Sequence, residues 1–155
     1  MAPLLAGAAA FVLARLIFCT AYVPTGSMAP AIPEKSFIVC WRLSYLVSDP
    51  VPECGDIVIF SHECMEERLV KRVIGCPGDT IEVVNGRVWR NGEKLDEPYL
   101  GDQVFSSERD GIYEVPEGKL FMMGDNRDDS YDGRYWQNHY VDVHDVFSKI
   151  IFRIG

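Results

Sequence analysis

The chain has 155 residues and a formal net charge of −8 at pH 7. That length is typical of one domain, and about 130 residues remain for a folded body once an apolar N-terminal segment is set aside, enough for one sizeable core. The acidic balance argues against a nucleic-acid partner, which would favour a basic stripe on the protein surface.

The chain begins with an apolar segment over residues 3–22, in which Arg15 is the single charge. A helix of about 20 residues rises about 30 Å, the thickness of the hydrocarbon core of a bilayer. We therefore predict a transmembrane anchor over residues 1–23 and a folded domain over residues 24–155. The alternatives are a cleaved signal peptide and a buried or interfacial helix. A signal peptide usually has Lys or Arg before its apolar run, and this segment has neither there. For the same reason, the positive-inside rule does not orient the segment.

The remainder of the chain has the pattern of β-strands. Short apolar runs of strand length occupy residues 36–41 and 56–60. Asn85-Gly86 lies between two β-rich flanks, which is the strongest short hairpin signal, and Asn91-Gly92 follows it. Residues 87–90 should therefore be the shared strand of a meander.

Further along the chain, a turn over residues 115–118 leads into an apolar run at 120–123, and a last strand is expected at 149–153. Residues 48–54 and 101–111 have the composition of loops. Strands joined by turns, with hardly any helical period, predict a mainly β fold of antiparallel sheets.

Two residues suggest chemistry. Ser27 directly follows the apolar segment, and Lys71 lies in the apolar run at 69–74. A serine is a weak nucleophile until a base takes its proton, and burial lets a lysine act as that base by disfavouring its charged form. Ser27 as nucleophile and Lys71 as general base predict a serine peptidase that works beside a membrane. The plainer interpretations are a turn serine and an outward-facing strand lysine.

Four runs of the sequence resemble, in order, the four sequence boxes of bacterial type I signal peptidases. They are PTGSMAP at 24–30, GDIVIF at 55–60, KRVIGCPGD at 71–79 and GDNRDDSYDGR at 124–134. The run LDEPYL at 95–100 also resembles the family, and the likeness extends from the apolar segment to about Arg153.

The resemblance implies antiparallel sheets of the signal-peptidase type, preceded by one transmembrane helix. It implies cleavage of N-terminal signal peptides from exported preproteins after small residues, of the Ala-x-Ala type. It also implies a single-pass protein of the cell membrane, with its catalytic domain on the outer face.

The resemblance assigns roles around the two central residues. The Ser27 backbone N–H and the Thr25 hydroxyl would hold the oxyanion, and Ser130 would hydrogen-bond the Lys71 amine. Neighbouring residues of a strand point to opposite faces, so one of Lys71 and Arg72 can face the serine while the other pairs with a carboxylate. The supporting ion pairs implied by the family are Arg72 with Asp125 and Asp132 with Arg134.

Two further expectations rest on the resemblance. Gly133 stands where the family usually has a serine, so we expect a looser loop there. A small apolar substrate pocket is implied, with plain core as the alternative for its five residues: Val23, Met28, Ile32, Leu69 and Val70.

We expect neither a cofactor nor a metal. The five cysteines lack Cys-x-x-Cys spacing, and in the run at 125–134 Arg127 and Tyr131 occupy would-be calcium-ligand positions. If Phe60 and Leu69 close a hairpin, Cys54 and Cys76 become near neighbours, and either a disulfide or two free thiols would fit. The three histidines are expected at the surface.

The expected partners are preprotein signal peptides and the lipid bilayer, with no nucleic acid, and the expected state is a monomer. One alternative function is a processing peptidase of the same family with a narrow set of clients. A self-cleaving repressor would need a DNA-binding helix-turn-helix, which no segment offers. The remaining alternative is an inactive, membrane-tethered binding module.

Overall fold

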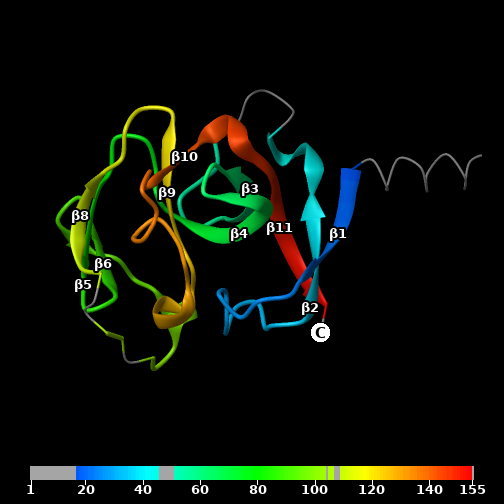
Figure 1. Ribbon diagram of the computed structural model, residues 1–155, viewed down its shortest axis with the longest axis horizontal. Helices are drawn as coiled ribbons and strands as arrows, with labels where there is room; N and C mark the ends of the chain where they lie inside the picture. The colour runs from blue at the N-terminus through cyan, green and yellow to red at the C-terminus, as the bar shows by residue number, and fades with distance from the viewer. Residues whose placement is uncertain (1–16, 46–50, 104, 107–108, 155) are drawn as a thin grey trace, which may run out of the picture.

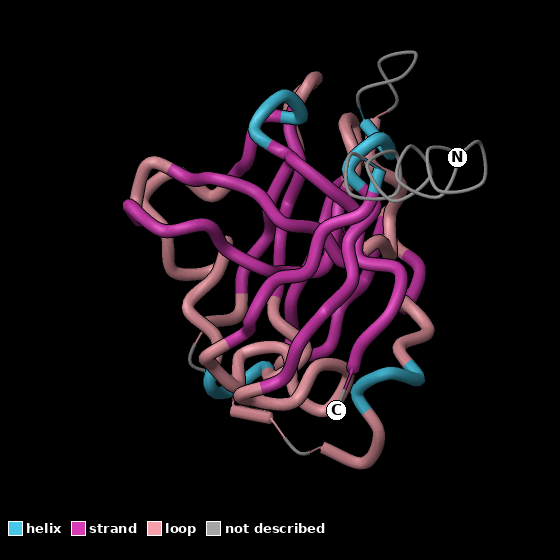
Figure 2. The backbone as a smooth tube through the Cα atoms, turned by 90° about the vertical axis from the view of Figure 1, so that its right-hand side faces the viewer, coloured by secondary structure: helices cyan, strands magenta, loops and turns pink. Residues whose placement is uncertain are grey.

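The computed structural model describes residues 17–45, 51–103, 105–106 and 109–154. Antiparallel strands are the main regular structure of this body, and the short helices lie at strand ends and in connections (Figure 2). The mainly β fold is therefore confirmed. No helix within these ranges is long and apolar enough to cross a membrane. Most of the predicted anchor, residues 1–16, lies outside the described residues.

The larger sheet has seven strands in the order β1-β2-β11-β3-β4-β9-β10. Their bounds are β1 Phe18–Val23, β2 Ser36–Trp41, β3 Ile57–His62, β4 Met65–Gly75, β9 Lys119–Met123, β10 Tyr140–Asp142 and β11 Val146–Ile154. The 3₁₀ helices are η1 Arg42–Tyr45, η2 Pro98–Leu100, η3 Arg127–Asp129 and η4 Val143–Asp145. In Figure 1 the strands β1, β2 and β11 lie on the right of the molecule.

The smaller sheet has four strands in the order β7-β6-β5-β8 and lies on the left of Figure 1. Its strands are β5 Thr80–Val84, β6 Arg87–Arg90, β7 Glu93–Lys94 and β8 Gly111–Glu114. The two Asn-Gly pairs form the turns of the predicted meander. Asn85 and Gly86 have φ values of 48° and 69°, and both lie in the left-handed region that a two-residue hairpin turn of type I′ requires.

The core consists of three apolar clusters. One fills the space around β3, β4, β9 and β10 and includes Phe60 and Trp136. A second joins the two sheets, with Ile74 from β4 and Ile81 from β5. The third packs the segment after β1 against the large sheet, where Met28 is fully buried. This third cluster fixes the position of Ser27, the neighbour of Met28.

The first strand corrects the predicted anchor. Residues Phe18–Val23 form β1, which pairs antiparallel with β2, so the expected helix does not extend over them. Their exposure alternates along the strand, with Cys19 and Ala21 partly buried and Thr20 and Tyr22 exposed. The backbone of β2 offers these residues a hydrogen-bonding partner, and the alternating pattern suits a strand with one buried face. The β body consequently begins at Phe18 rather than at residue 24.

Candidate active site

Ser27 and Lys71 lie together although 44 residues separate them. Ser27 is half-buried in a turn after β1, where the backbone N–H of Ala29 donates to the Gly26 carbonyl at 3.0 Å. Lys71 lies on β4 and is 4% exposed. Its Nζ donates to the Ser27 Oγ at 2.6 Å. The structure therefore places the predicted nucleophile and the predicted base in direct hydrogen-bond contact.

Burial lowers the pKa of Lys71 from 10.5 to about 8, and nearby carboxylates oppose this shift without reversing it. Asp132 is the main opposing charge, but it is already paired with Arg134. Asp125 is likewise paired with Arg72. Since the two acids with the largest opposing effect are each paired with an arginine, desolvation dominates over them and over the smaller effect of Asp129. A large fraction of the Lys71 amine is then neutral near pH 8, which is the form that can accept a proton.

The ion pair between Arg72 and Asp125 is formed as expected. Arg72 Nε donates to Asp125 Oδ1 at 2.8 Å and Nη2 donates to Oδ2 at 2.6 Å. The same guanidinium donates to the Gly55 carbonyl at 2.8 Å and lies 3.8 Å from the centre of the Tyr99 ring. Lys71 and Arg72 thus serve opposite faces of β4, one toward the serine and one toward the carboxylate.

The pair of Asp132 and Arg134 is also formed. Arg134 Nε donates to Asp132 Oδ1 at 2.8 Å, and the Gly124 backbone N–H donates to Asp132 Oδ2 at 2.9 Å. Arg134 Nη2 reaches the Arg127 carbonyl at 2.7 Å. These bonds tie both ends of the loop from residue 124 to residue 134 beside the lysine.

Sequence reasoning missed the role of Asn126. Its backbone N–H donates to the Ser27 carbonyl, and its Nδ2 donates to the Gly26 carbonyl, both at 3.1 Å. One residue therefore holds the backbone of the serine turn through two bonds. Its place beside Asp125 in the last sequence box was the available signal.

Arg127 is a second residue whose role was missed. It is fully buried, donates to the Gly86 carbonyl at 2.6 Å and to the Gly124 carbonyl at 3.1 Å, and forms an ion pair with Glu97. It therefore connects a hairpin turn of the small sheet to the loop beside Lys71. Glu97 lies in the 95–100 run that resembled the family, which was the only hint in the sequence.

Ser130 departs from expectation. Its side chain is buried beside Gly124, where an added Cβ would meet both the Ser130 hydroxyl and the Ser27 carbonyl. The hydroxyl makes no hydrogen bond to any described residue, so the expected bond to the Lys71 amine is not formed in this structure. The amine points instead at Ser27. Thr25 is exposed two residues before Ser27, and its oxyanion role stays a prediction.

Four of the five expected pocket residues meet in one apolar cluster, and the pocket itself stays a prediction. Val23, Met28 and Ile32 are buried in the cluster behind Ser27 because that turn needs apolar filling. Val70 on β4 packs against this same cluster, whereas its neighbour Leu69 packs against the cluster around Phe60. Among the described residues, a cavity of about 880 Å³ lies between β1, β4, η1 and β11, and of the five only Val70 lines it.

Cys54 and Cys76 form a disulfide, with Cα atoms 5.9 Å apart. The register of β3 and β4, in which Phe60 faces Leu69, brings them together as the residue numbers predicted. Of the two alternatives for this pair, the disulfide is therefore confirmed and the two free thiols are wrong. The disulfide closes the open end of the hairpin that carries Lys71.

The expectation of surface histidines is wrong for His62. That side chain is 7% exposed and stacks on Trp136, with ring centres 4.2 Å apart. The large indole covers the hairpin end of β3 and shields the imidazole from solvent. His144 is exposed, as expected.

The loop at Gly133 is tight rather than loose. A Cβ at this position would lie 2.9 Å from the carbonyl oxygens of Met122 and His139 and from the Phe121 ring. Two of these three neighbours are backbone atoms, which cannot rotate away. Close packing therefore requires glycine at this position, because the loop has no room for a side chain.

Comparison with known proteins agrees with this geometry. The family model described as "Signal peptidase, peptidase S26" matches residues 1–154. The chain belongs to this family.

Among its relatives, signal peptidase I of Bacillus caldolyticus is 36% identical over 153 residues, covering 90% of this chain and 81% of that protein. Signal peptidase I of Leptolyngbya laminosa is 32% identical and is matched over 66% of its length, with 85% of this chain covered. The probable signal peptidase I-2 of Synechocystis sp. is 35% identical, with 74% of this chain and 54% of that protein covered. The chain thus spans between about half and two thirds of the last two relatives.

Among solved structures, the crystal structure of a signal peptidase I from Enterococcus faecalis matches with a TM-score of 0.57 and 32% sequence identity. The match covers 64% of this chain and 97% of that chain. The fold is therefore that of a signal peptidase.

We predict that Gly133→Ser, which introduces the residue usual in the signal peptidase family, destabilises this chain. Overpacking against two carbonyls should lower the free energy of unfolding by roughly 1–3 kcal/mol. Gly26→Ser is the matched control, because the nearest atom to a Cβ there is 3.8 Å away and its φ is outside the left-handed region. Denaturant titration measures both, and a Gly133 variant as stable as the wild type would show that the loop has slack.

We predict that Lys71→Met stabilises the protein at pH 7. The folded-state pKa of about 8 lies below the ordinary value of 10.5, so the folded state disfavours the proton. This costs the wild type on the order of 3 kcal/mol below pH 8, partly offset by the lost Ser27 hydrogen bond. The cost fades as pH rises from about 8 to 10.5, because only the unfolded chain still holds the proton there.

Unfolding titrations of the wild type and Lys71→Met across that pH range measure the effect as a difference between the two proteins. Lys94→Met, at an exposed lysine on β7, is the control and should show no pH-dependent difference. A Lys71→Met difference that stays constant with pH would contradict a lowered lysine pKa.

Proposed function

We propose that the chain is a membrane-bound serine endopeptidase that removes N-terminal signal peptides from exported preproteins. The observation that carries this proposal is the contact of 2.6 Å between a buried lysine amine and the Ser27 hydroxyl. Family membership supports the reaction class, and relatives named signal peptidase I support the substrate class.

In the proposed mechanism, the neutral Lys71 amine accepts the Ser27 proton while the Oγ attacks the scissile carbonyl carbon. The carbonyl oxygen becomes an oxyanion, held by the Ser27 backbone N–H and the Thr25 hydroxyl. The lysine ammonium then gives its proton to the leaving amine, and an acyl-enzyme remains on Ser27. Lys71 next takes a proton from water, which attacks the ester and releases the signal peptide.

The fold supports binding of an extended substrate. β1 is an edge strand of the large sheet, and it leads directly into the turn that carries Ser27. An extended peptide can add to such an edge through backbone hydrogen bonds, while pockets select alternate side chains. Val70 is the pocket candidate that lines the cavity of about 880 Å³. Cleavage after small residues of the Ala-x-Ala type is part of the proposal and rests on the likeness to relatives named signal peptidase I.

An exposed apolar face supports a location at a membrane. On β1 and β2, Phe18 faces Trp41 and Tyr22 faces Phe37, and all four are at least 42% exposed. Phe152 and Ile154 continue this exposed face onto β11. Aromatic side chains suit the boundary between lipid and water, and this face begins where the apolar N-terminal segment ends. We propose a single-pass topology with the catalytic domain on the outer face, where the Cys54–Cys76 disulfide would persist.

We predict that the detergent-solubilised full chain cleaves a labelled preprotein, and that Ser27→Ala and Lys71→Met each reduce turnover by roughly 1,000-fold or more. Residues that act as one unit lose nearly the whole effect when either is removed. Ser106→Ala, at an exposed serine, is the control and should keep wild-type turnover. Wild-type turnover in Ser27→Ala would remove the nucleophile, and an inactive wild-type chain would favour a membrane-tethered binding module.

We also predict that kcat/KM rises with pH through a value near 8 and then levels off. The base must be neutral, and burial places the pKa of Lys71 at about 8. Initial rates on the same preprotein across about pH 6–10 measure this limb. A profile that falls across this range would contradict a lysine base.

A further inference from the structure

A second pair of cysteines faces each other across β1 and β2. Cys19 and Cys40 are direct partners in the antiparallel register, and both are free thiols. Directly paired residues of antiparallel strands have Cα atoms about 4.5 or 5.5 Å apart and side chains on the same face. Both spacings fall within the range of about 4.4–6.8 Å that a disulfide needs. The backbone therefore already has the geometry of a cross-strand disulfide.

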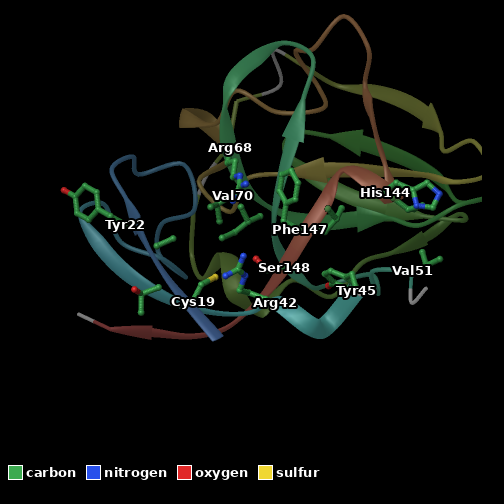
Figure 3. A pocket seen from close by; sticks show the side chains of 15 residues that line it. Cys19, Tyr22, Arg42, Tyr45, Val51, Arg68, Val70, His144, Phe147 and Ser148 are labelled. Carbon is green, nitrogen blue, oxygen red and sulfur yellow. The ribbon is translucent and has the colours of Figure 1, made fainter. Parts of the chain in front are cut away.

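The two thiols differ in accessibility. Cys40 is fully buried, whereas Cys19 is half-buried and lines the cavity of about 880 Å³. Figure 3 shows Cys19 and Ser148 among the side chains around this cavity. Cys40 is hydrogen-bonded to both of these residues, and burial raises its pKa to about 12. A reagent that enters the cavity therefore meets Cys19 first, with the Cys40 thiol held behind it.

The charge of the cavity selects the reagent. Two guanidinium groups, those of Arg42 and Arg68, line it, and no carboxylate does so among the described residues. Opposite charge raises the local concentration of a ligand, so an anionic reagent is favoured over a cationic one.

We propose that Cys19 and Cys40 form an oxidisable dithiol, which closes to a second disulfide by exchange with an anionic disulfide that enters the cavity. In the first step the Cys19 thiolate attacks one sulfur of the reagent, forms a mixed disulfide and releases one thiolate. In the second step Cys40 loses its proton and attacks the Cys19 sulfur, which releases the second thiolate. The protein loses two hydrogens, and the reagent is reduced to two thiols.

The closed disulfide would constrain the segment that carries the serine. Ser27 lies between Cys19 and Cys40 in the chain, so the bond closes a ring that contains the whole turn after β1. A crosslink that closes such a loop restricts the unfolded chain and stabilises the fold.

The test uses the full chain in detergent with Cys64→Ser, which removes the exposed third thiol. Dithiobis(nitrobenzoate), an anionic aromatic disulfide, is the probe. We expect two nitrothiobenzoate ions per chain, an intact mass lower by two hydrogens with no adduct, and a crosslinked peptide containing Cys19 and Cys40. The oxidised chain should melt roughly 5 °C or more above the reduced one.

Matched variants separate closure from independent modification. Cys40→Ala, which suits a buried site, should release one ion and keep an adduct on Cys19. Cys19→Ser should slow the release at least tenfold, because Cys40 is buried. Closure by anionic dithiodiglycolate should be faster than closure by cationic cystamine. Adducts retained on both cysteines, or no reaction at all, would overturn the proposal, and equal rates would overturn the charge preference.

Discussion

The buried amine of Lys71, bonded to the Ser27 hydroxyl, is the group on which the rest of the structure depends. Burying a lysine is costly when it is charged, and this cost is what lowers its pKa to about 8. A carboxylate free to pair with the amine would hold it protonated. The fold avoids this outcome because Asp125 and Asp132 each bond an arginine instead. The ion pairs beside the site therefore leave Asp125 and Asp132 bonded to arginines rather than to the lysine, in addition to holding loops in place.

This constraint explains the surroundings of β4. The strand lies between β3 and β9 inside the large sheet, which buries Lys71 and fixes its direction. The Cys54–Cys76 disulfide closes one end of the hairpin, and Asn126 holds the backbone of the serine turn from the opposite side. Each of these contacts fixes an element that carries one partner of the 2.6 Å bond. Rigid support of this kind suits a reaction that needs the two groups in register before a substrate arrives.

The small sheet contributes through buried charge. Arg127 spans from the Gly86 turn to the Gly124 carbonyl and pairs with Glu97, so it connects the meander to the loop beside Lys71. A buried pair of this type is costly to break from one side, because the remaining charge loses its partner. The other end of the molecule is open by comparison, since β1 is an edge strand with exposed aromatic residues and a cavity beside it. The base lies on β4 inside the large sheet, whereas the edge strand β1 is where a peptide or a membrane can approach.

Several of these features could be predicted from the sequence alone, because they depend on the chemistry of short stretches of the chain. Asn85-Gly86 forms a hairpin because both residues tolerate positive φ, and the numbering of Phe60 and Leu69 predicts the register that joins Cys54 to Cys76. The motifs around Ser27 and Lys71 identified the dyad because its chemistry needs those residue types.

Only the tertiary structure decided the remainder, since each of those features depends on residues distant in the chain. Phe18–Val23 is a strand because β2 offers it a partner, and an apolar composition by itself does not distinguish that strand from a helix. Gly133 is tight because Met122 and His139 bring their carbonyls to it, and His62 is buried because Trp136 covers it. Burial and close approach are properties of the assembled fold, and no local pattern of residues encodes them.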